Sequence, residues 1–143
     1  MIACGSKPFS YVKPEVKHNA IVYIYRPDAK NPGWQPLSRK YPEVWLDGKS
    51  LGVLKHNRYI AIELEPGVHN LKFTGLTSEA NWNMPELKRK FSVRHAEQKY
   101  FRFLIQYDPK TLGVLERTKY LQFLTPMSHD KAIYEIRELS LQD

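Results

Sequence analysis

The chain has 143 residues, about the length of one domain, of which 42% are hydrophobic and 26% charged. This composition excludes a disordered chain, no apolar run reaches the roughly 18 residues of a transmembrane helix, and the single cysteine excludes an intrachain disulfide and the usual zinc sites built on several thiolates. Lysine and arginine outnumber aspartate and glutamate by 22 to 15, and the resulting net charge of +7 favours phosphate, lipid headgroups or acidic partners.

The first residues carry a short motif around the only cysteine. An aliphatic residue and a small one, Ile2 and Ala3, directly precede Cys4. This pattern resembles the lipobox of bacterial lipoproteins, in which the signal is cut before the cysteine and the cysteine carries the lipid. The resemblance implies a lipid anchor at Cys4 and, because neither Gly5 nor Ser6 is acidic, a place in the outer membrane facing the periplasm. A signal sequence would have to lie upstream, and the alternative is an ordinary cytoplasmic start with an incidental thiol.

Residues 1–18 combine this motif with prolines, serines and alternating lysines, and they show little hydrophobic periodicity. Such a segment predicts a flexible tether between an anchor and a folded domain. The domain itself is expected to occupy residues 19–143.

The first strands of the expected domain lie between residues 20 and 54. Residues 20–25 are apolar on both faces, which predicts a central strand, and Pro27 ends it. Residues 44–46 and 51–54 flank Asp47-Gly48, and an Asp-Gly pair between apolar runs is a strong hairpin signal.

Further strands are predicted by alternation at residues 58–64, 68–74, 87–93, 99–107 and 120–124. After Pro126, apolar residues at the spacing i, i+3, i+4, i+7 predict an amphipathic helix over residues 128–139 with Ser128 as its N-cap. Together these elements predict a mainly β fold. We expect an antiparallel two-layer β-sandwich, of the immunoglobulin-like or transthyretin-like kind, with one C-terminal helix packed on a sheet.

Three segments together carry a resemblance to a known family. They are residues 20–27, which end in Tyr-Arg-Pro, residues 44–54, which contain the Asp-Gly hairpin, and residues 64–71, which contain a Pro-Gly-Val-His turn. In this order they resemble small bacterial envelope lipoproteins of unknown function whose central part is similar to the PEGA repeat, a small β-sandwich module of surface proteins. The likeness covers mainly residues 20–74, and the segment after Lys110 has no counterpart. The family has no established catalytic residues, so the resemblance implies none here.

The sequence carries no complete catalytic or metal-binding motif. Gly48-Lys49-Ser50 mimics the end of a phosphate-binding P-loop, but it lies in the predicted hairpin rather than before a helix. No two of the 5 histidines are three or four residues apart, so paired metal ligands are not expected. His69 is interpreted as a satisfied core or turn residue. We therefore expect neither an enzyme nor a cofactor.

Two sets of residues are candidates for binding a partner. The first is a basic face, with the members Lys88, Lys90, Arg94, Lys99 and Arg102. The second is a sugar-stacking platform or partner hot spot formed by Trp34, Trp45 and Trp82, of which Trp34 and Trp82 are the expected contacts. The alternative is that Trp45 is a core residue and that the other two tryptophans cover loop edges.

The leading hypothesis is a non-enzymatic envelope lipoprotein, tethered to the membrane by its lipid, that binds a protein or glycan partner of the cell wall or of a secretion machine. The rival is a cytoplasmic nucleic-acid-binding β-domain, which the basic and aromatic residues favour but the lipobox does not. A small hydrolase has no positive support in the sequence.

Overall fold

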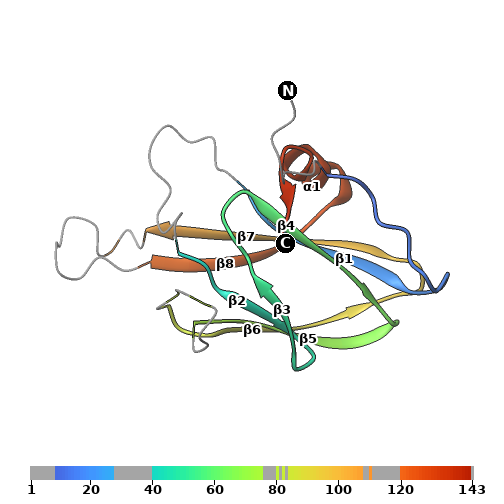
Figure 1. Cartoon of the computed structure of the whole chain (residues 1–143), viewed down its shortest axis with the longest axis horizontal. Helices are drawn as coiled ribbons and strands as arrows, with labels where there is room; N and C mark the ends of the chain where they lie inside the picture. Colours follow the sequence, from blue (N-terminus) through green and yellow to red (C-terminus); the bar gives the residue numbers. More distant parts are fainter. Residues whose placement is uncertain are drawn as a thin grey trace.

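The computed structural model describes residues 9–27, 40–75, 80, 82, 84–107, 110 and 120–142. Within these residues the chain forms two stacked β-sheets, and a helix, α1, covers the outer side of one of them (Figure 1). We call the sheet next to α1 sheet A and the other one sheet B. The expected mainly β sandwich with a helix near the C-terminus is therefore confirmed.

Among the described residues, sheet A has the strand order β8-β7-β1-β4-β9 and sheet B the order β3-β2-β5-β6. The strands of sheet A are β1 (Ala20–Arg26), β4 (Arg58–Leu64), β7 (Gln98–Tyr107), β8 (Tyr120–Met127) and β9 (Ser140–Leu141). Those of sheet B are β2 (Glu43–Leu46), β3 (Lys49–Val53), β5 (Gly67–Thr74) and β6 (Leu87–Val93). Every strand that the alternation predicts is present, whereas the short β9 is not predicted by it.

Strand β1 lies at the centre of the molecule. All of its residues are buried. Val22 and Ile24 face the core between the two sheets, whereas Tyr23 and Tyr25 face a second apolar cluster beneath α1. A strand with two buried faces is a nearly continuous apolar run in the sequence, which is why residues 20–25 predict a central position.

The main core lies between the sheets and is rich in aromatic rings. Phe103 of β7 is fully buried, and its ring stacks on Phe73 of β5 with the centroids 4.6 Å apart. The guanidinium of the buried Arg26 lies 5.5 Å from the centre of the Trp82 ring, and its Nη1 donates to the carbonyl of Lys40 at 2.7 Å. Burial lowers the pKa of Arg26 to about 10, so this side chain stays charged at neutral pH. The aromatic faces and the carbonyl compensate part of the cost of burying that charge.

Sheet A is not purely antiparallel, in contrast to the predicted sandwich, whereas sheet B is. Strand β7 runs parallel to β1, and β9 runs parallel to β4. The chain reaches β7 directly from β6 of the other sheet through the turn at residues 94–97, so no hairpin with β1 sets its direction. Alternation along a strand is the same for either direction of pairing, and the sequence pattern therefore does not distinguish them.

Strand β8 is longer than predicted. It continues through Pro126 to Met127 instead of ending at residue 124. In sheet A it is an edge strand whose neighbour is β7, and a residue without an N–H is tolerated at such an edge. The proline therefore does not end the strand.

Helix α1 spans His129–Ile136 and is shorter than the predicted 128–139. Ser128 occupies the N-cap position with an extended backbone, but its side chain makes no capping hydrogen bond. Leu139 is buried although it follows the helix, because the chain turns there and leads the side chain back into the cluster beneath α1. The apolar period therefore extends beyond the helix itself. No helix in the described part of the chain has the length and apolar character needed to cross a membrane.

Residues 9–18, which the composition assigns to a flexible tether, lie against the outer side of sheet A. We call them the N-terminal strap. The ring of Phe9 packs edge-on against Tyr23 and Tyr59, with centroid distances of 5.4 and 5.3 Å. The Glu63 carboxylate accepts hydrogen bonds from the backbone N–H groups of Glu15 and Val16 at 2.6 and 3.1 Å. The bond from Glu15 has the largest effect on the pKa of Glu63, which these bonds lower. The strap is therefore part of the folded body, because it covers apolar rings of sheet A.

Replacing Phe103 by alanine should lower the free energy of unfolding by about 3 to 5 kcal/mol, because it removes a fully buried ring from the stack with Phe73. The control Lys90→Ala, at an exposed position of β6, should change it by no more than about 0.5 kcal/mol. Urea unfolding followed by tryptophan fluorescence measures both values. Comparable losses in the two variants would contradict the assigned register of these strands.

Candidate functional site

Lys88 and Lys90 project from the outer side of sheet B. Both lie on the edge strand β6, where exposure alternates along the strand and puts them at exposed positions. On the opposite face of the same strand, Leu87, Phe91 and Val93 face the core. The structure confirms the predicted alternation on this strand.

The other members of the predicted basic face lie elsewhere. Arg94 follows β6 in the turn to β7, where its backbone N–H donates to the carboxylate of Glu97 at 2.9 Å. Lys99 and Arg102 lie on β7 of sheet A, and Arg102 forms an ion pair with Glu135 of α1 at 3.2 Å. The five residues are therefore not one face, because the chain changes sheet between β6 and β7.

The tryptophans differ from both interpretations of the sequence. Trp82 is only 4% exposed and belongs to the main core, so it is not a surface contact. Trp45 of β2 is partly exposed and points outward, because Val44 and Leu46 on either side of it face the core. Trp34 lies outside the described residues. The apolar residues flanking Trp45 are the sequence signal that marks its outward position.

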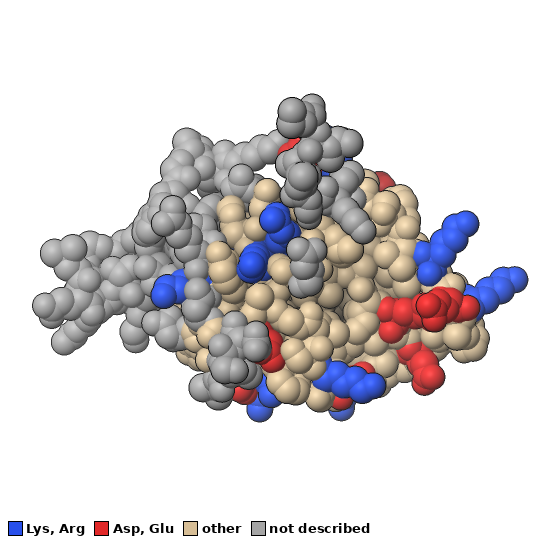
Figure 2. Space-filling view, viewed as in Figure 1, with Lys and Arg blue, Asp and Glu red and all other residues tan. Residues whose placement is uncertain are grey.

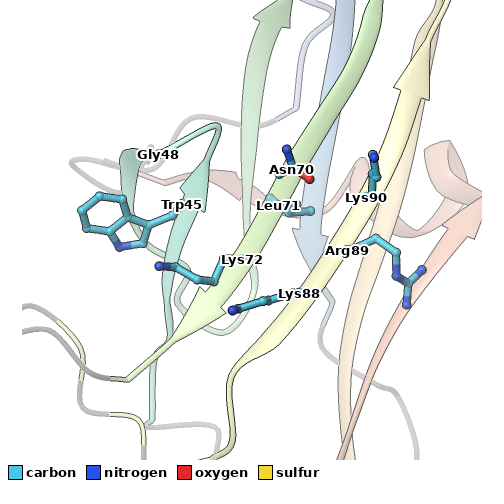
Figure 3. Close-up of a pocket in the computed structure, with 8 residues that line it drawn as sticks. All are labelled: Trp45, Gly48, Asn70, Leu71, Lys72, Lys88, Arg89 and Lys90. Carbon is cyan, nitrogen blue, oxygen red and sulfur yellow. The ribbon is translucent and has the colours of Figure 1, made fainter.

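Trp45, Lys72 and Lys88 form a row across sheet B. Trp45 is the register partner of Lys72 on β5, and Lys72 is the register partner of Lys88 on β6. The Lys72 ammonium lies 5.3 Å from the centre of the Trp45 ring, within the range of a cation–π contact. Figure 3 shows these three side chains on one side of the sheet, whereas Arg89 points away from them. Sequence reasoning missed Lys72 and left the position of Trp45 open, because only the register of three strands brings both residues beside Lys88.

A groove of about 530 Å³ lies over this row. It is also lined by Asn70, which pairs in register with Lys90, and by Gly48 of the β2–β3 hairpin. Gly48 has a φ of +81°, and a Cβ added there would meet no atom within 4 Å, so this end of the groove is open. We call this site the basic groove and define it by Trp45, Asn70, Lys72, Lys88 and Lys90.

The basic groove carries more positive charge than the described carboxylates balance. Lys72 and Lys88 are like charges at opposed positions, an arrangement that destabilises a sheet. Glu86 approaches Lys88 at 3.8 Å, while its other oxygen accepts from the hydroxyl of Thr74. Within the described ranges, no carboxylate forms an ion pair with Lys72 or Lys90. Figure 2 shows both basic and acidic side chains on the sheet B side of the molecule, at the bottom of the view. The groove lysines supply the excess positive charge that attracts anions.

Asp47 and His69 form a pair beside the groove. His69 Nδ1 lies 2.5 Å from Asp47 Oδ2, and Nε2 lies 2.7 Å from the carbonyl oxygen of Glu65. The second oxygen of Asp47 accepts from the backbone N–H of Asn70 at 2.8 Å. Partial burial lowers the pKa of His69, but the bonds to Asp47 and Glu65 outweigh it and raise the pKa above 6.5. Both ring nitrogens face acceptors, so the imidazolium form satisfies the site, and the prediction of a satisfied turn residue is confirmed.

The remaining motifs add no second site. Gly48-Lys49-Ser50 lies in the β2–β3 hairpin as predicted, and strand β3 rather than a helix follows it. In the described part of the chain, no group of three or more His, Cys, Asp or Glu side chains is arranged to hold a metal ion. Cys4, the predicted point of lipid attachment, lies outside the described residues.

The free energy of unfolding should fall as the pH rises through the raised pKa of His69. The stabilisation by protonated His69 is fully present below 6.5, its ordinary pKa, and is lost above the pKa of the folded state. Burial raises the pKa of Asp47, but the hydrogen bonds from His69 and Asn70 outweigh burial and lower this pKa below 3.8. The stabilisation by ionised Asp47 is therefore lost only as the pH falls through the lowered pKa.

Urea unfolding at about pH 6 and about pH 9 measures the alkaline part of this dependence. His69→Gln should remove most of the decrease, whereas His95→Gln, in the exposed turn between β6 and β7, should retain it. The same decrease in wild type and His69→Gln would show that another group is responsible.

The chain matches one family of known proteins over most of its length. Residues 16–114, from the end of the strap to beyond β7, match the model of a family described as a protein of unknown function, DUF2846. No curated protein and no solved structure matches the chain. The expectation of a family of unknown function is confirmed, whereas the lipoprotein character and the likeness to the PEGA repeat stay predictions. Because the matched residues make up more than half of the chain, the protein belongs to the DUF2846 family.

Proposed function

We propose that the protein is a non-enzymatic lipoprotein of the bacterial outer membrane that faces the periplasm and binds an anionic glycan or protein partner of the cell envelope in the basic groove. The lipid is attached at Cys4, and no cofactor is required. One observation carries the binding part of the proposal. Lys72 and Lys88 are opposed across β5 and β6, with Lys90 beside them.

Protection of a sheet edge accounts for only part of this charge. Lysines on an edge strand discourage pairing with other chains, and this is sufficient reason for Lys88 and Lys90 on β6. Lys72 is different, because β5 lies inside sheet B between β2 and β6. A lysine at this position protects no edge, and although it contacts Trp45, it stands opposite another lysine, an arrangement that lowers stability. A bound anion offsets the repulsion between Lys72 and Lys88. This is why we interpret the row from Trp45 to Lys88 as a binding site.

The N-terminal strap gives an anchor at Cys4 a direction. Phe9 packs on the outer side of sheet A, near α1 and on the side opposite to sheet B (Figure 1). Cys4 precedes Phe9 by 9 − 4 = 5 residues, and a fully extended chain of that length spans at most about 18 Å. A lipid at Cys4 therefore keeps sheet A toward the membrane and turns the basic groove toward the periplasm. The partner is then a component of the periplasm or cell wall and not the anchoring membrane.

The Asp47–His69 pair supports a non-enzymatic role. Both nitrogens of His69 and both oxygens of Asp47 take part in hydrogen bonds that fix the β2–β3 hairpin against β5. Neither side chain can transfer a proton to a ligand in the groove without giving up one of these bonds. The pair is therefore a structural latch.

A nucleic-acid ligand has less support than an envelope component. Proteins that bind single strands stack successive bases on several aromatic side chains along a basic groove. On the outer side of the described strands of sheet B, Trp45 is the aromatic residue, since Phe73 and Phe91 face the core. A single ring supports one stacked group rather than a series of bases.

Expressed behind a lipoprotein signal sequence in a bacterial host, the chain should incorporate labelled fatty acid and fractionate with the outer membrane. Cys4→Ser should abolish both results, because the sulfur that carries the lipid is removed. Ser6→Ala is the matched control and should behave as the wild type. Equal labelling of Cys4→Ser would end the lipoprotein part of the proposal.

The purified chain should bind isolated peptidoglycan sacculi, an anionic glycan of the periplasm, at about 150 mM salt. The double variant Lys88→Glu with Lys90→Glu should weaken this binding at least about tenfold, because it reverses charge in the groove while leaving the core intact. Lys17→Glu with Lys131→Glu makes the same charge change on the strap and α1, and should have little effect. Co-sedimentation measures binding, and far-ultraviolet circular dichroism checks the fold.

Two results of this experiment contradict the proposal. Equal binding by the double variant and the wild type would exclude the basic groove. Saturable micromolar binding of a thymidine oligonucleotide at about 150 mM salt, lost in the double variant and falling steeply as salt increases, would favour the nucleic-acid function instead.

A further inference from the structure

We propose that the ligand of the basic groove is a glycan containing acidic sugars, with one sugar ring stacked on Trp45 and the acid groups held by Lys72, Lys88 and Lys90. This inference rests on the proposed function and names its ligand class. It is argued from the ring, the spacing of the cations and the polar groups between them.

Trp45 offers a flat apolar surface in otherwise polar surroundings. Its ring is partly exposed at the centre of a cross-strand row, between Ser50 of β3 and Lys72 of β5. The apolar C–H face of a sugar ring packs on such an aromatic surface, while its hydroxyl groups need polar neighbours. The Lys72 ammonium lies over this ring, 5.3 Å from its centre, so a sugar on the ring shares it with a cation or displaces that cation to the edge. The acid group of a sugar stacked on Trp45 is therefore close to the Lys72 ammonium.

The spacing of the strands sets the length of the ligand. Strands β2 and β6 are separated by β5, so Trp45 and Lys88 are two strand spacings apart, or about 9 to 10 Å. Lys90 is two residues farther along β6, a step of about 7 Å. A single sugar ring on Trp45 does not extend to both lysines. The geometry therefore favours an oligosaccharide with acid groups on successive or alternate rings.

Polar groups line the path between the ring and the distant lysines. Asn70 lies between the hairpin and Lys90, and its side-chain amide both donates and accepts hydrogen bonds, as sugar hydroxyl groups require. The glycine at position 48 leaves the hairpin end open, so a longer chain can continue past it. The groove volume of about 530 Å³ is within the usual range of small-ligand sites, roughly 300 to 1,000 Å³.

An acidic peptide uses the charges of the groove but not the ring. Peptides bind sheets most often by adding a strand to an edge, which would engage the backbone of β6 and leave Trp45 two strands away. Simple anions such as phosphate use the lysines alone. Dependence on Trp45 together with the lysines therefore distinguishes an acidic glycan from both.

The test uses three related probes: tetragalacturonate, its methyl ester and tetraglutamate. They present rings with acids, rings without charge and acids without rings. Tetragalacturonate should shift the Trp45 indole Nε1–H resonance, assigned with Trp45→Phe, and should bind at least about tenfold more tightly than either other probe. Trp45→Ala and Lys72→Gln should each weaken its binding at least about tenfold. Lys131→Gln, on the exposed side of α1, should leave it unchanged.

Each contrary result has a distinct meaning. If tetraglutamate binds as tightly as tetragalacturonate, or if Trp45→Ala binds as well as the wild type, the glycan inference fails while an anionic envelope partner is retained. Tighter binding of a thymidine decamer than of tetragalacturonate also overturns the inference. If no probe binds and sacculi are not captured, the inference and the proposed function both fail. Should Trp45→Ala not fold, the comparison of tetragalacturonate with tetraglutamate on the wild type still tests whether the ligand needs sugar rings.

Discussion

The burial of β1 on both faces is the constraint on which the rest of the structure depends. A strand that is apolar on two sides needs a packing layer on each of them. Sheet B supplies the layer over Val22 and Ile24, whereas α1 and the N-terminal strap supply the layer over Tyr23 and Tyr25. Sheet A is consequently the middle of the molecule, and sheet B is buried on its inner side. Within the described residues, the outer side of sheet B packs against no further layer, so it can carry groups that a core excludes.

The residues that stabilise the fold therefore differ from those that form the proposed binding site. The stack of Phe103 on Phe73 holds the two sheets together, and it lies on the opposite side of sheet B from the basic groove. The groove depends instead on polar contacts at the hairpin, since the Asp47–His69 latch fixes β2 against β5 and thereby fixes Trp45 beside Lys72. A change in protonation at this latch alters the site before it alters the core.

Side-chain alternation was sufficient to locate the strands but not to pair them. It predicts the buried β1, the Asp-Gly hairpin and the outward direction of Lys88 and Lys90, because each is a property of one short segment. Pairing depends on two segments at once, so the parallel β1–β7 contact and the row from Trp45 to Lys88 are not visible in the sequence. The same limit explains why Arg102 was assigned to the basic face, although it pairs with α1. Composition failed for residues 9–18, where one proline, two lysines and little hydrophobic periodicity predict a tether, although Phe9 fixes the strap to sheet A.

The strap also determines how the protein responds to force. In a chain held at its N-terminus, tension reaches Phe9 first, then the backbone groups bound to Glu63, and only afterwards β1. The strap contacts lie one after another along the chain, so they open singly and each releases a short length. The ladders that join β1 to β4 and β7 carry load side by side and resist together. Small extensions at the N-terminus are therefore taken up by the strap, while the sandwich stays folded.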